Sequence, residues 1–317
     1  MRVRLLYHDR CFDGACSAAL FIDFFRAAFD SKAEFSLTGM FHRANQTFED
    51  ALFDGDQNAI VDFKYCSSEK LTWWFDHHQS AFLNDDDAKH FYADRSGRKF
   101  FDSTFKSCTK YIAHIGGEKF GYDSSHLEAL IHWANIIDGA QYENARAAVE
   151  MKAPAMKLTL VFEAAKENLT ARIIPLLASR PLEEIVALDE VQACFGPLFE
   201  RHLTSVETIR ERARQHGRVI YFDLSDTDLE GYSKFIPYYL FPESTYTVSV
   251  SDAGFRTKIS VGSNPWAPQE PRVNLATVCE SYGGGGHARV GAISYGPGEI
   301  ERARATAREI IERLSAS

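Results

Sequence analysis

An aspartate and two adjacent histidines stand at the end of an apolar run in the segment WWFDHHQS. They are Asp76, His77 and His78. Burial of a charged group without a partner costs several kcal/mol or more, so this cluster needs a metal ion, an ion pair or solvent to satisfy it. Histidine nitrogen and carboxylate oxygen together are ligands that suit Mn, Mg, Fe or Zn ions. A metal centre is therefore the chemical hypothesis that these residue types raise.

Two earlier apolar runs carry the same kinds of residue at their ends. VRLLYH ends at His8 and AIVDF contains Asp62, while a helical pattern over 127–137 is followed by Asp138. Strands that alternate with helices, including one expected over 15–29, predict a parallel α/β sheet. Ligands of such sheets bind beyond the carboxyl ends of the strands, so these side chains are expected to meet the histidine pair in one crevice.

A pair of divalent ions is a common device for the hydrolysis of phosphate esters. Such ions activate water and absorb the negative charge that builds on the phosphoryl oxygens. One carboxylate has to bridge them, and Asp62 is the natural candidate because it stands alone at its strand end. Taken singly, His8 or Asp138 is better explained as an ordinary cap, turn or surface residue. The combination with the histidine pair is what favours the metal interpretation.

The segment YHDRCFDGACSAA joins the first strand to the first helix. Gly14 after Asp13 permits a tight turn, and the small residues that follow let the helix begin near the strand end, where its N-terminus attracts anions. An ordinary strand-to-helix turn with Asp13 as the cap explains the same pattern.

A second motif, YGGGGHARVGA, lies near the end of the chain. Four successive glycines at 283–286 allow the backbone to approach a ligand closely, their N–H groups could form an anion-binding nest, and His287 could add a donor or positive charge. Upstream, Arg256, Asn264 and Trp266 offer a cation, an amide and an aromatic ring for a nucleotide. A flexible turn and a half-exposed strand are the alternative interpretations.

Size and charge limit the classes of function. A chain of 317 residues is long enough for two domains. Its formal net charge of −9 argues against sequence-independent binding of long duplex nucleic acid, which depends on many Lys and Arg contacts to phosphates. With no signal-peptide pattern and no stretch of membrane-span length, a cytoplasmic protein without a membrane partner is expected. Six cysteines without CxxC spacing indicate neither a disulfide framework nor a structural zinc site.

Three regions are expected along the chain. Residues 1–150 form the first α/β domain. Residues 151–216 are rich in Leu, Ala, Glu and Arg, which predicts a helical connector. Residues 217–317 change to short β-type runs, followed by the glycine-rich motif and a helix over 297–314, which predicts a smaller second α/β domain. The acidic segment NDDDAKH is expected to be an exposed loop.

In this order, the motifs resemble those of the DHH-DHHA1 phosphoesterases, the family of RecJ exonucleases, nanoRNase/pAp phosphatases and cyclic dinucleotide phosphodiesterases. YHDRCFDG, VDF, FDHHQS and IIDG resemble the four metal motifs of the DHH domain, and GGGGHARVGA resembles the GGGH motif of DHHA1. The resemblance covers nearly the whole chain. It implies an N-terminal parallel-sheet DHH domain, a helical connector, a smaller C-terminal DHHA1 domain and an active site between the two domains. It also implies two divalent ions, expected to be Mn²⁺, with Mg²⁺ as the alternative.

The family's residue roles can be carried over onto matching positions. The positions that match metal ligands are His8, Asp13, Asp62, His77 and Asp138. Asp62 resembles the catalytic bridging ligand, Asp76 a residue that orients a histidine, and His78 the catalytic histidine that faces the scissile phosphate. The positions expected to bind the far end of the substrate are Arg256, Asn264, Gly284, Gly285, Gly286 and His287.

The first motif departs from the family pattern. Many relatives have two aspartates separated by one residue, whereas the earlier of these positions is Cys11 here. This HxxCxDG pattern leaves one metal site short of a carboxylate. Either Asp9 supplies the missing oxygen, or the thiolate of Cys11 binds and favours a softer ion.

These features favour a metal-dependent phosphoesterase that acts on short oligonucleotides, dinucleotides or pAp-like substrates, because an acidic chain can neutralise only a few phosphates locally. Hydrolysis of inorganic pyrophosphate or polyphosphate is a second interpretation, and the DHHA1-like motif argues against it. A non-catalytic nucleotide-binding protein that has lost one metal is a third, which Cys11 keeps open. A homodimer is an open alternative for the assembly.

Overall fold

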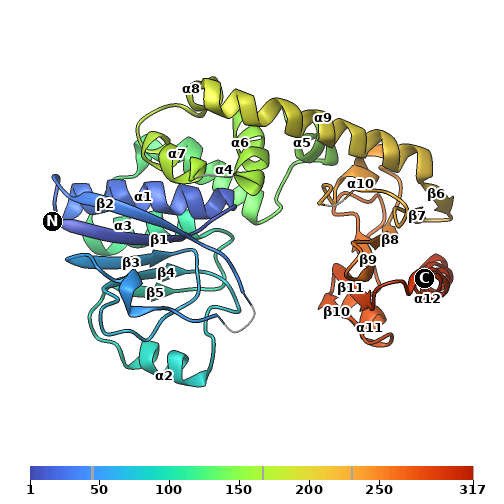
Figure 1. Cartoon of the computed structure of the whole chain (residues 1–317), viewed down its shortest axis with the longest axis horizontal. Helices are drawn as coiled ribbons and strands as arrows, with labels where there is room; N and C mark the ends of the chain where they lie inside the picture. Colours follow the sequence, from blue (N-terminus) through green and yellow to red (C-terminus); the bar gives the residue numbers. More distant parts are fainter. Residues whose placement is uncertain (44–45, 166–167, 230, 317) are drawn as a thin grey trace. The chain divides into compact units, whose positions relative to one another are not determined.

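The computed structural model describes residues 1–43, 46–165, 168–229 and 231–316 (Figure 1). Its contacts divide the chain into two compact units. Unit 1 consists of residues 1–142 and 152–196, and unit 2 of residues 143–151 and 197–317. The predicted connector is largely helical where it is described, and residues 166–167 of it lie outside the described residues. Its earlier helices belong to unit 1, and the long helix α9 (Asp189–Arg212) contributes to both units.

A five-stranded parallel sheet forms the centre of unit 1, in the order β2-β1-β3-β4-β5. Its strands are β1 (Arg2–His8), β2 (Glu34–Met40), β3 (Gln57–Val61), β4 (Trp73–Asp76) and β5 (Lys99–Phe101). Val3, Leu5 and Tyr7 of β1 pack into one core, whereas Leu6 packs into another on the opposite face. Both faces are therefore covered, which explains why the strands are apolar throughout. The predicted parallel α/β sheet is confirmed.

The helices of unit 1 supply most of the larger core. They are α1 (Phe12–Ala28), α2 (Asp85–Ala93), α3 (Cys108–Phe120), α4 (Glu128–Asp138), α6 (Pro154–Ala164), α7 (Leu169–Leu177) and α8 (Leu182–Val186), with 3-10 turns η1 (Asp50–Leu52) and η2 (Ser125–Leu127). Helix α1 is buried along most of its length and packs against α3, α4 and α7. The helices predicted over 15–29 and 127–137 are present, and the first of them begins earlier, at Phe12.

The prediction of an exposed loop at NDDDAKH is wrong, because this segment begins α2. The side chain of Asn84 accepts a hydrogen bond from the backbone N–H of Asp87 and caps the helix. Asp85, Asp86 and Asp87 occupy the first turn, where the helix dipole stabilises negative charge. The acidic residues therefore favour the helix start.

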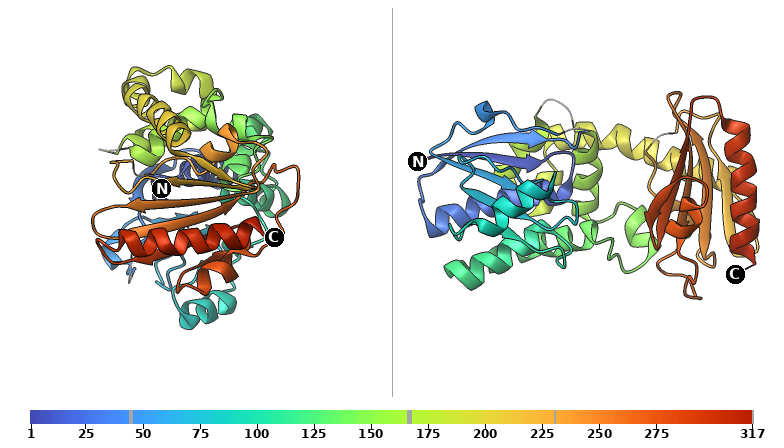
Figure 2. Two further views of the ribbon diagram at one scale, coloured as in Figure 1. Left: turned by 90° about the vertical axis from the view of Figure 1, so that its right-hand side faces the viewer. Right: turned by 90° about the horizontal axis from the view of Figure 1, so that it is seen from below.

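Unit 2 contains a six-stranded mixed sheet in the order β10-β11-β9-β8-β7-β6, in which only β7 and β8 pair in parallel. Its strands are β6 (Arg214–His216), β7 (Val219–Asp223), β8 (Tyr246–Asp252), β9 (Thr257–Ser263), β10 (Gly285–His287) and β11 (Val290–Tyr295). Its helices, besides its part of α9, are α5 (Ala145–Val149), α10 (Ile236–Leu240), α11 (Leu275–Glu280) and α12 (Ile300–Ser315). Helix α12 lies along one face of the sheet (Figure 2), where Val248, Ile259 and Ile310 share a core. The predicted C-terminal α/β region is confirmed.

Within the described ranges, every helix is too short or too polar to cross a membrane.

Candidate metal centre

The carboxyl ends of β1, β3 and β4 lie side by side because β3 pairs with both of the other strands. His8 ends β1, Asp62 directly follows β3, and His77 directly follows β4. Asp13 lies in the first turn of α1, and Asp138 is the last residue of α4. All five predicted ligands thus come from element ends that meet at one edge of the sheet.

The side chains of these residues converge on one another. The Nε2 atom of His77 lies 3.7 Å from Asp13 Oδ2, 3.4 Å from Asp62 Oδ1 and 3.3 Å from Asp138 Oδ2. The Nδ1 atom of His8 lies 3.4 Å from the other oxygen of Asp62. One imidazole nitrogen therefore faces three carboxylates, and Asp62 stands between the two histidines.

Asp62 is completely buried and has an unusual backbone conformation. Its φ of 56° lies in the left-handed region, which aspartate tolerates better than most residues and which is enriched at functional sites. Within the described residues, both of its carboxylate oxygens, His8 Nδ1 and His77 Nε2 have no hydrogen-bond partner. Each such atom costs about 1–3 kcal/mol when buried. A divalent cation at this point would satisfy all four atoms, so the donor set fits a metal ion.

His77 is oriented by the backbone. Its Nδ1 lies 3.2 Å from the carbonyl oxygen of Phe105, which can only accept, so Nδ1 carries a proton and Nε2 is the ring nitrogen that faces the carboxylates. Metal-binding imidazoles are usually held in this way. Burial lowers the pKa of His77, but the nearby carboxylates of Asp62, Asp13 and Asp138 raise it to about 10.

His78 is held by Asp76 instead. One buried oxygen of Asp76 accepts from His78 Nδ1 at 2.7 Å and from the backbone N–H groups of His77 and His78 at 2.8 and 3.3 Å. Burial lowers the pKa of His78, whereas the hydrogen bond to Asp76 raises it to about 9. Asp76, which is expected to orient a histidine, therefore lies against His78.

Asp13 combines its predicted position at the centre with an ordinary capping contact. Its carboxylate accepts from the backbone N–H groups of Cys108 at 2.6 Å and Thr109 at 3.1 Å, and from the Thr109 hydroxyl at 2.6 Å. These are the first residues of α3, so Asp13 ties α1 to α3. Burial and the charges of Asp62 and Asp138 raise the pKa of Asp13 well above its usual range.

Gly14 is required for a different reason than the one predicted from the sequence. It is a helical residue inside α1, so its conformation does not call for glycine. A Cβ atom at this position would lie 2.0 Å from the carbonyl oxygen of His8. Glycine therefore allows α1 to begin directly against the end of β1, which brings Asp13 to the centre.

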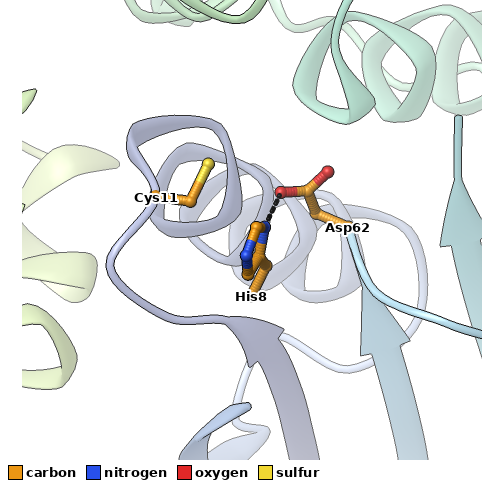
Figure 3. Close-up of side chains that lie close together, drawn as sticks. All are labelled: His8, Cys11 and Asp62. Carbon is orange, nitrogen blue, oxygen red and sulfur yellow. Dashed lines mark ion pairs between the residues drawn. The ribbon is translucent and has the colours of Figure 1, made fainter. Parts of the chain in front are cut away.

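Among the described residues, three groups of three donor atoms could hold metal ions. They are His8, Cys11 and Asp62; Asp62, His77 and His78; and Asp13, His77 and Asp138, with the atoms of each group within 4.8 Å of one another. Asp62 belongs to two of these groups, which fits the predicted role of a bridging ligand. His8, Cys11 and Asp62 are shown together in Figure 3.

A further histidine at this edge, His42, is one that the sequence alone did not indicate. Its ring lies 4.7 Å from that of His8 and stacks on Phe63 at 4.6 Å. Burial, followed by the charges of His8 and His78, lowers the pKa of His42 to about 4. The one signal in the sequence is its position just after β2, the strand next to β1.

In unit 2, the glycine-rich motif forms the start of a β-hairpin. The backbone N–H groups of Gly283 and Gly284 donate to the carbonyl oxygens of Glu280 and Cys279 at 3.0 and 2.8 Å, which ends α11. These two amides are therefore not available for an anion. An anion-binding nest in this motif would therefore have to use the amides that follow Gly284.

The other glycines of the motif and His287 differ in how closely a ligand could approach them. A Cβ atom at Gly284 or Gly286 would lie 2.2 or 2.3 Å from a carbonyl oxygen of β11, so these glycines are needed for hairpin packing. A Cβ atom added at Gly285 would meet no atom of the described residues within 4 Å, and His287 is exposed at the edge of the sheet. Gly285 and His287 remain accessible for a ligand.

The structure does not bring Arg256 and Asn264 together. Arg256 precedes β9 and Asn264 follows it, so a seven-residue strand separates them. The backbone N–H of Ser263 donates to Arg289, which puts the Asn264 end of β9 beside the β10–β11 hairpin. The Asn264 side chain makes three hydrogen bonds to backbone groups, one of them from Trp266 N–H at 2.9 Å. Its amide therefore shapes this loop.

Unit 2 also contains a pocket of about 290 Å³ next to this loop. Its walls include Trp266 and Tyr239 as aromatic surfaces and Arg146 as a cation. Trp266 and Asn264, which the sequence suggested for nucleotide binding, line this pocket, whereas Arg256 does not and the cation Arg146 comes from α5.

No protein-family model matches the chain, and no curated protein matches its sequence. Solved structures do match. The pGpG-specific phosphodiesterase PggH from Vibrio cholerae has a TM-score of 0.71 at 19% identity, over 99% of both chains. A DHH domain described as a member of the s1p family of ribosomal proteins has a TM-score of 0.60 at 13% identity, over 99% of this chain and 87% of that one. RecJ from Thermus thermophilus, in complex with Mn²⁺, has a TM-score of 0.50 at 14% identity, over 98% of this chain and 52% of RecJ.

At these identities the likeness shows a shared fold. It confirms the predicted architecture of an N-terminal parallel-sheet region of the DHH type followed by helices and a smaller C-terminal α/β region.

Proposed function

We propose that this chain is a metal-dependent phosphoesterase of the DHH-DHHA1 type, which hydrolyses phosphodiester or phosphomonoester bonds of short nucleotides. The main support is the group of buried atoms around Asp62, His8 and His77, which have no hydrogen-bond partner among the described residues and point at one another. The fold that the chain shares with PggH, a pGpG-specific phosphodiesterase, supports a nucleotide substrate.

Two divalent ions are proposed to bind at this edge of the sheet, Mn²⁺ in the first place and Mg²⁺ as the alternative. The ligands would be His8, Asp13, Asp62, His77 and Asp138, with Asp62 shared between the ions. Ions of this kind lower the pKa of water and neutralise charge on phosphoryl oxygens. The protein's own contribution is to hold the donor atoms in place before substrate binds, so that little reorganisation is needed during the reaction.

His78 is proposed to contact the scissile phosphate. Asp76 fixes the ring through Nδ1, which leaves Nε2 as the atom that is free to face a substrate. The negative charge of Asp76 favours the protonated imidazole, which can donate to a phosphoryl oxygen. Asp76 would therefore act on the reaction only by positioning His78.

Unit 2 is proposed to bind another part of the nucleotide. His287 is exposed at the sheet edge, and a Cβ atom added at Gly285 would meet no described atom within 4 Å, so a ligand can approach both residues. The net charge of −9 fits a short substrate, because only a few phosphates can be neutralised locally.

The test is a hydrolysis panel with Mn²⁺ that covers pAp, short RNA and DNA oligomers, linear dinucleotides such as pGpG, cyclic dinucleotides and pyrophosphate. We expect hydrolysis of one or more short nucleotides, loss of activity after chelation, recovery on addition of Mn²⁺, and no cleavage of pyrophosphate. Asp62→Ala tests the assigned bridging ligand, and a mock purification without this protein is the control for contaminating activity.

Three outcomes contradict the proposal. Cleavage of pyrophosphate alone would identify an inorganic pyrophosphatase. Activity retained in Asp62→Ala would show that the bridging ligand is wrongly assigned. No hydrolysis across the panel, together with at most one bound ion per chain, would identify a non-catalytic nucleotide-binding protein.

A further inference from the structure

Cys11 occupies the position that caps the N-terminus of α1, yet it does not act as a cap. Its backbone is extended, with φ −131° and ψ 134°, as is usual for a capping residue, but within the described part of the chain its side chain makes no capping hydrogen bond. Ser, Thr, Asp and Asn are preferred at such positions because their oxygen atoms bind the free N–H groups of the helix. A thiol is a weak hydrogen-bond acceptor and a poor substitute for these oxygen atoms.

The sulfur lies with two other donor atoms instead. The Sγ of Cys11, a ring nitrogen of His8 and a carboxylate oxygen of Asp62 all lie within 4.8 Å of one another (Figure 3). Ligands of a zinc-type ion stand about 2.0–2.3 Å from the metal, so two donors of one ion are separated by no more than about 4.6 Å. A set of three donors at this spacing can close on a single ion with small side-chain movements.

The two partners of Cys11 are independently unsatisfied. Asp62 is fully buried, and neither of its oxygens nor His8 Nδ1 finds a hydrogen-bond partner among the described residues. These atoms point to a ligand at the position that the sulfur also faces.

Asp9, the other residue that could complete this site, is directed elsewhere. Its Oδ1 accepts a hydrogen bond from the backbone N–H of Arg10 at 2.8 Å. Its carboxylate packs over Gly39, where a Cβ atom would lie 2.4 Å from Asp9 Oδ2. Among the described residues, Asp9 belongs to none of the three donor groups.

We propose that Cys11 is a metal ligand and that, together with His8 and Asp62, it makes one of the two ion positions thiophilic. Binding replaces the S–H bond with a sulfur–metal bond and releases one proton to solvent. Zn²⁺, Co²⁺ and Cd²⁺ are then favoured at this position, whereas the position formed by Asp13, His77 and Asp138 has only nitrogen and oxygen donors and suits Mn²⁺ or Mg²⁺. The inference rests on the metal centre of the proposed function and adds a difference between its two ions.

Cobalt binding to the metal-free full-length protein tests this assignment without any measurement of activity. Titration with Co²⁺ should produce a thiolate-to-cobalt charge-transfer band in the near ultraviolet. Cys11→Ser should abolish the band, and Asp9→Asn should leave it unchanged. Cys194→Ser is the matched control, because Cys194 is a half-buried cysteine outside the three donor groups. The fold of each variant is checked by circular dichroism and thermal unfolding.

Metal content distinguishes failure of this inference from failure of the proposed function. Cobalt bound without the band, or a band that survives in Cys11→Ser, would overturn the assignment of Cys11 and leave the metal centre standing. Absence of any bound cobalt in the wild type would overturn both. We also expect Cys11→Asp to lower the ratio of Zn²⁺ to Mn²⁺ affinity at least about tenfold, and an unchanged ratio would contradict the assignment.

Discussion

Asp62 in unit 1 and Asp223 in unit 2 both stand at the carboxyl end of a strand, but their carboxylates have opposite surroundings. Asp223 accepts from the backbone N–H and hydroxyl of Ser225 at 2.9 and 2.6 Å, and from the guanidinium of Arg304 at 2.7 Å. Asp62 is fully buried, and within the described part of the chain neither of its oxygens accepts a hydrogen bond. The Asp223 carboxylate joins neighbouring elements through hydrogen bonds. The Asp62 carboxylate is fixed in place by the surrounding structure but has no such partner among the described residues.

The two carboxylates affect the stability of their units in opposite ways. A buried, unsatisfied carboxylate destabilises unit 1 and persists only because the strands on either side and the large aromatic core fix it. Groups of this kind collect at functional sites, where they await a ligand. Most buried side-chain polar atoms of unit 2 have partners among the described residues, which suits the binding role proposed for this unit.

The sharpest way to break the comparison is to neutralise Asp62 without changing its shape. Asparagine also tolerates the left-handed conformation, so Asp62→Asn should fold. Because it removes the charge shared by two ions, we expect kcat to fall at least about a thousandfold, equivalent to about 4 kcal/mol of barrier. Hydrolysis and bound metal are measured together.

Asp102→Asn is the matched control. Asp102 follows β5 of the same sheet, is only partly buried, and accepts from the N–H and hydroxyl of Thr104 at 2.8 and 2.7 Å. Its loss should leave kcat within about twofold of the wild type, since surface changes rarely exceed about 0.5 kcal/mol. Equal losses in the two variants would mean that Asp62 is no more than another turn residue.

The next largest effect is expected from a substitution of Gly14, which lies where α1 begins against the end of β1. In Gly14→Ala the new methyl group would lie 2.0 Å from the carbonyl oxygen of His8, so the helix must move. We expect a loss of about 1–3 kcal/mol in the free energy of unfolding, as for other overpacked sites, together with weaker metal binding. Denaturant unfolding and metal titration measure the two effects.

Gly117→Ala provides the reference for this change. Gly117 is also helical, in α3, but a Cβ atom there meets its nearest neighbour at 3.6 Å. Alanine should stabilise this helix by up to about 1 kcal/mol. If Gly14→Ala is equally harmless, the close contact does not position the centre.

Most of the residues proposed as metal ligands could be picked out from the sequence because they lie at the end of an apolar strand or of the amphipathic helix α4. The sequence could not predict their surroundings. AIVDF and VIYFD follow the same rule of an apolar run ending in aspartate, yet Asp62 is left unsatisfied and Asp223 is bound by an arginine 81 positions away. Contacts between distant residues decide which aspartate has hydrogen-bond partners.

Other differences have equally local causes. The charge of the acidic segment before Lys89 suggests an exposed loop, but the capping pattern that Asn84 forms with it is visible in the sequence and outweighs that signal. His42 belongs to no motif, and only the pairing of β2 with β1 brings it to His8. The use of the Gly283 and Gly284 amides to end α11 is a property of backbone geometry that composition does not reveal.

A smaller effect should appear in unit 2 when its exposed histidine is removed. If unit 2 contributes recognition and unit 1 the chemistry, His287→Ala should raise KM by about tenfold, or about 1.4 kcal/mol, and leave kcat nearly unchanged. His216→Ala is the matched control, because His216 is an exposed histidine on the opposite edge strand of the same sheet. A fall in kcat for His287→Ala would instead place His287 among the catalytic groups.

The smallest effect concerns the satisfied aspartate of unit 2. Burial raises the pKa of Asp223, but hydrogen bonds from Ser225 and Arg304 outweigh it and hold this pKa below its usual range. A carboxylate with a lowered folded pKa stabilises the protein above its unfolded pKa of about 4, and this contribution is lost as the pH falls through the folded value. Because the ion pair is partly exposed, Asp223→Asn should lower the free energy of unfolding by only about 0.5–1 kcal/mol at pH 7, and this loss should shrink below about pH 4.

Denaturant unfolding at pH 7 and below pH 4 measures the loss, with the exposed Asp228→Asn as a control expected to show no such trend. If Asp223→Asn loses the same free energy of unfolding at both pH values, hydrogen bonds that do not need the charge of Asp223 stabilise unit 2. Asp223 and Asp62 would then differ in their neighbours and not in the use of their charge.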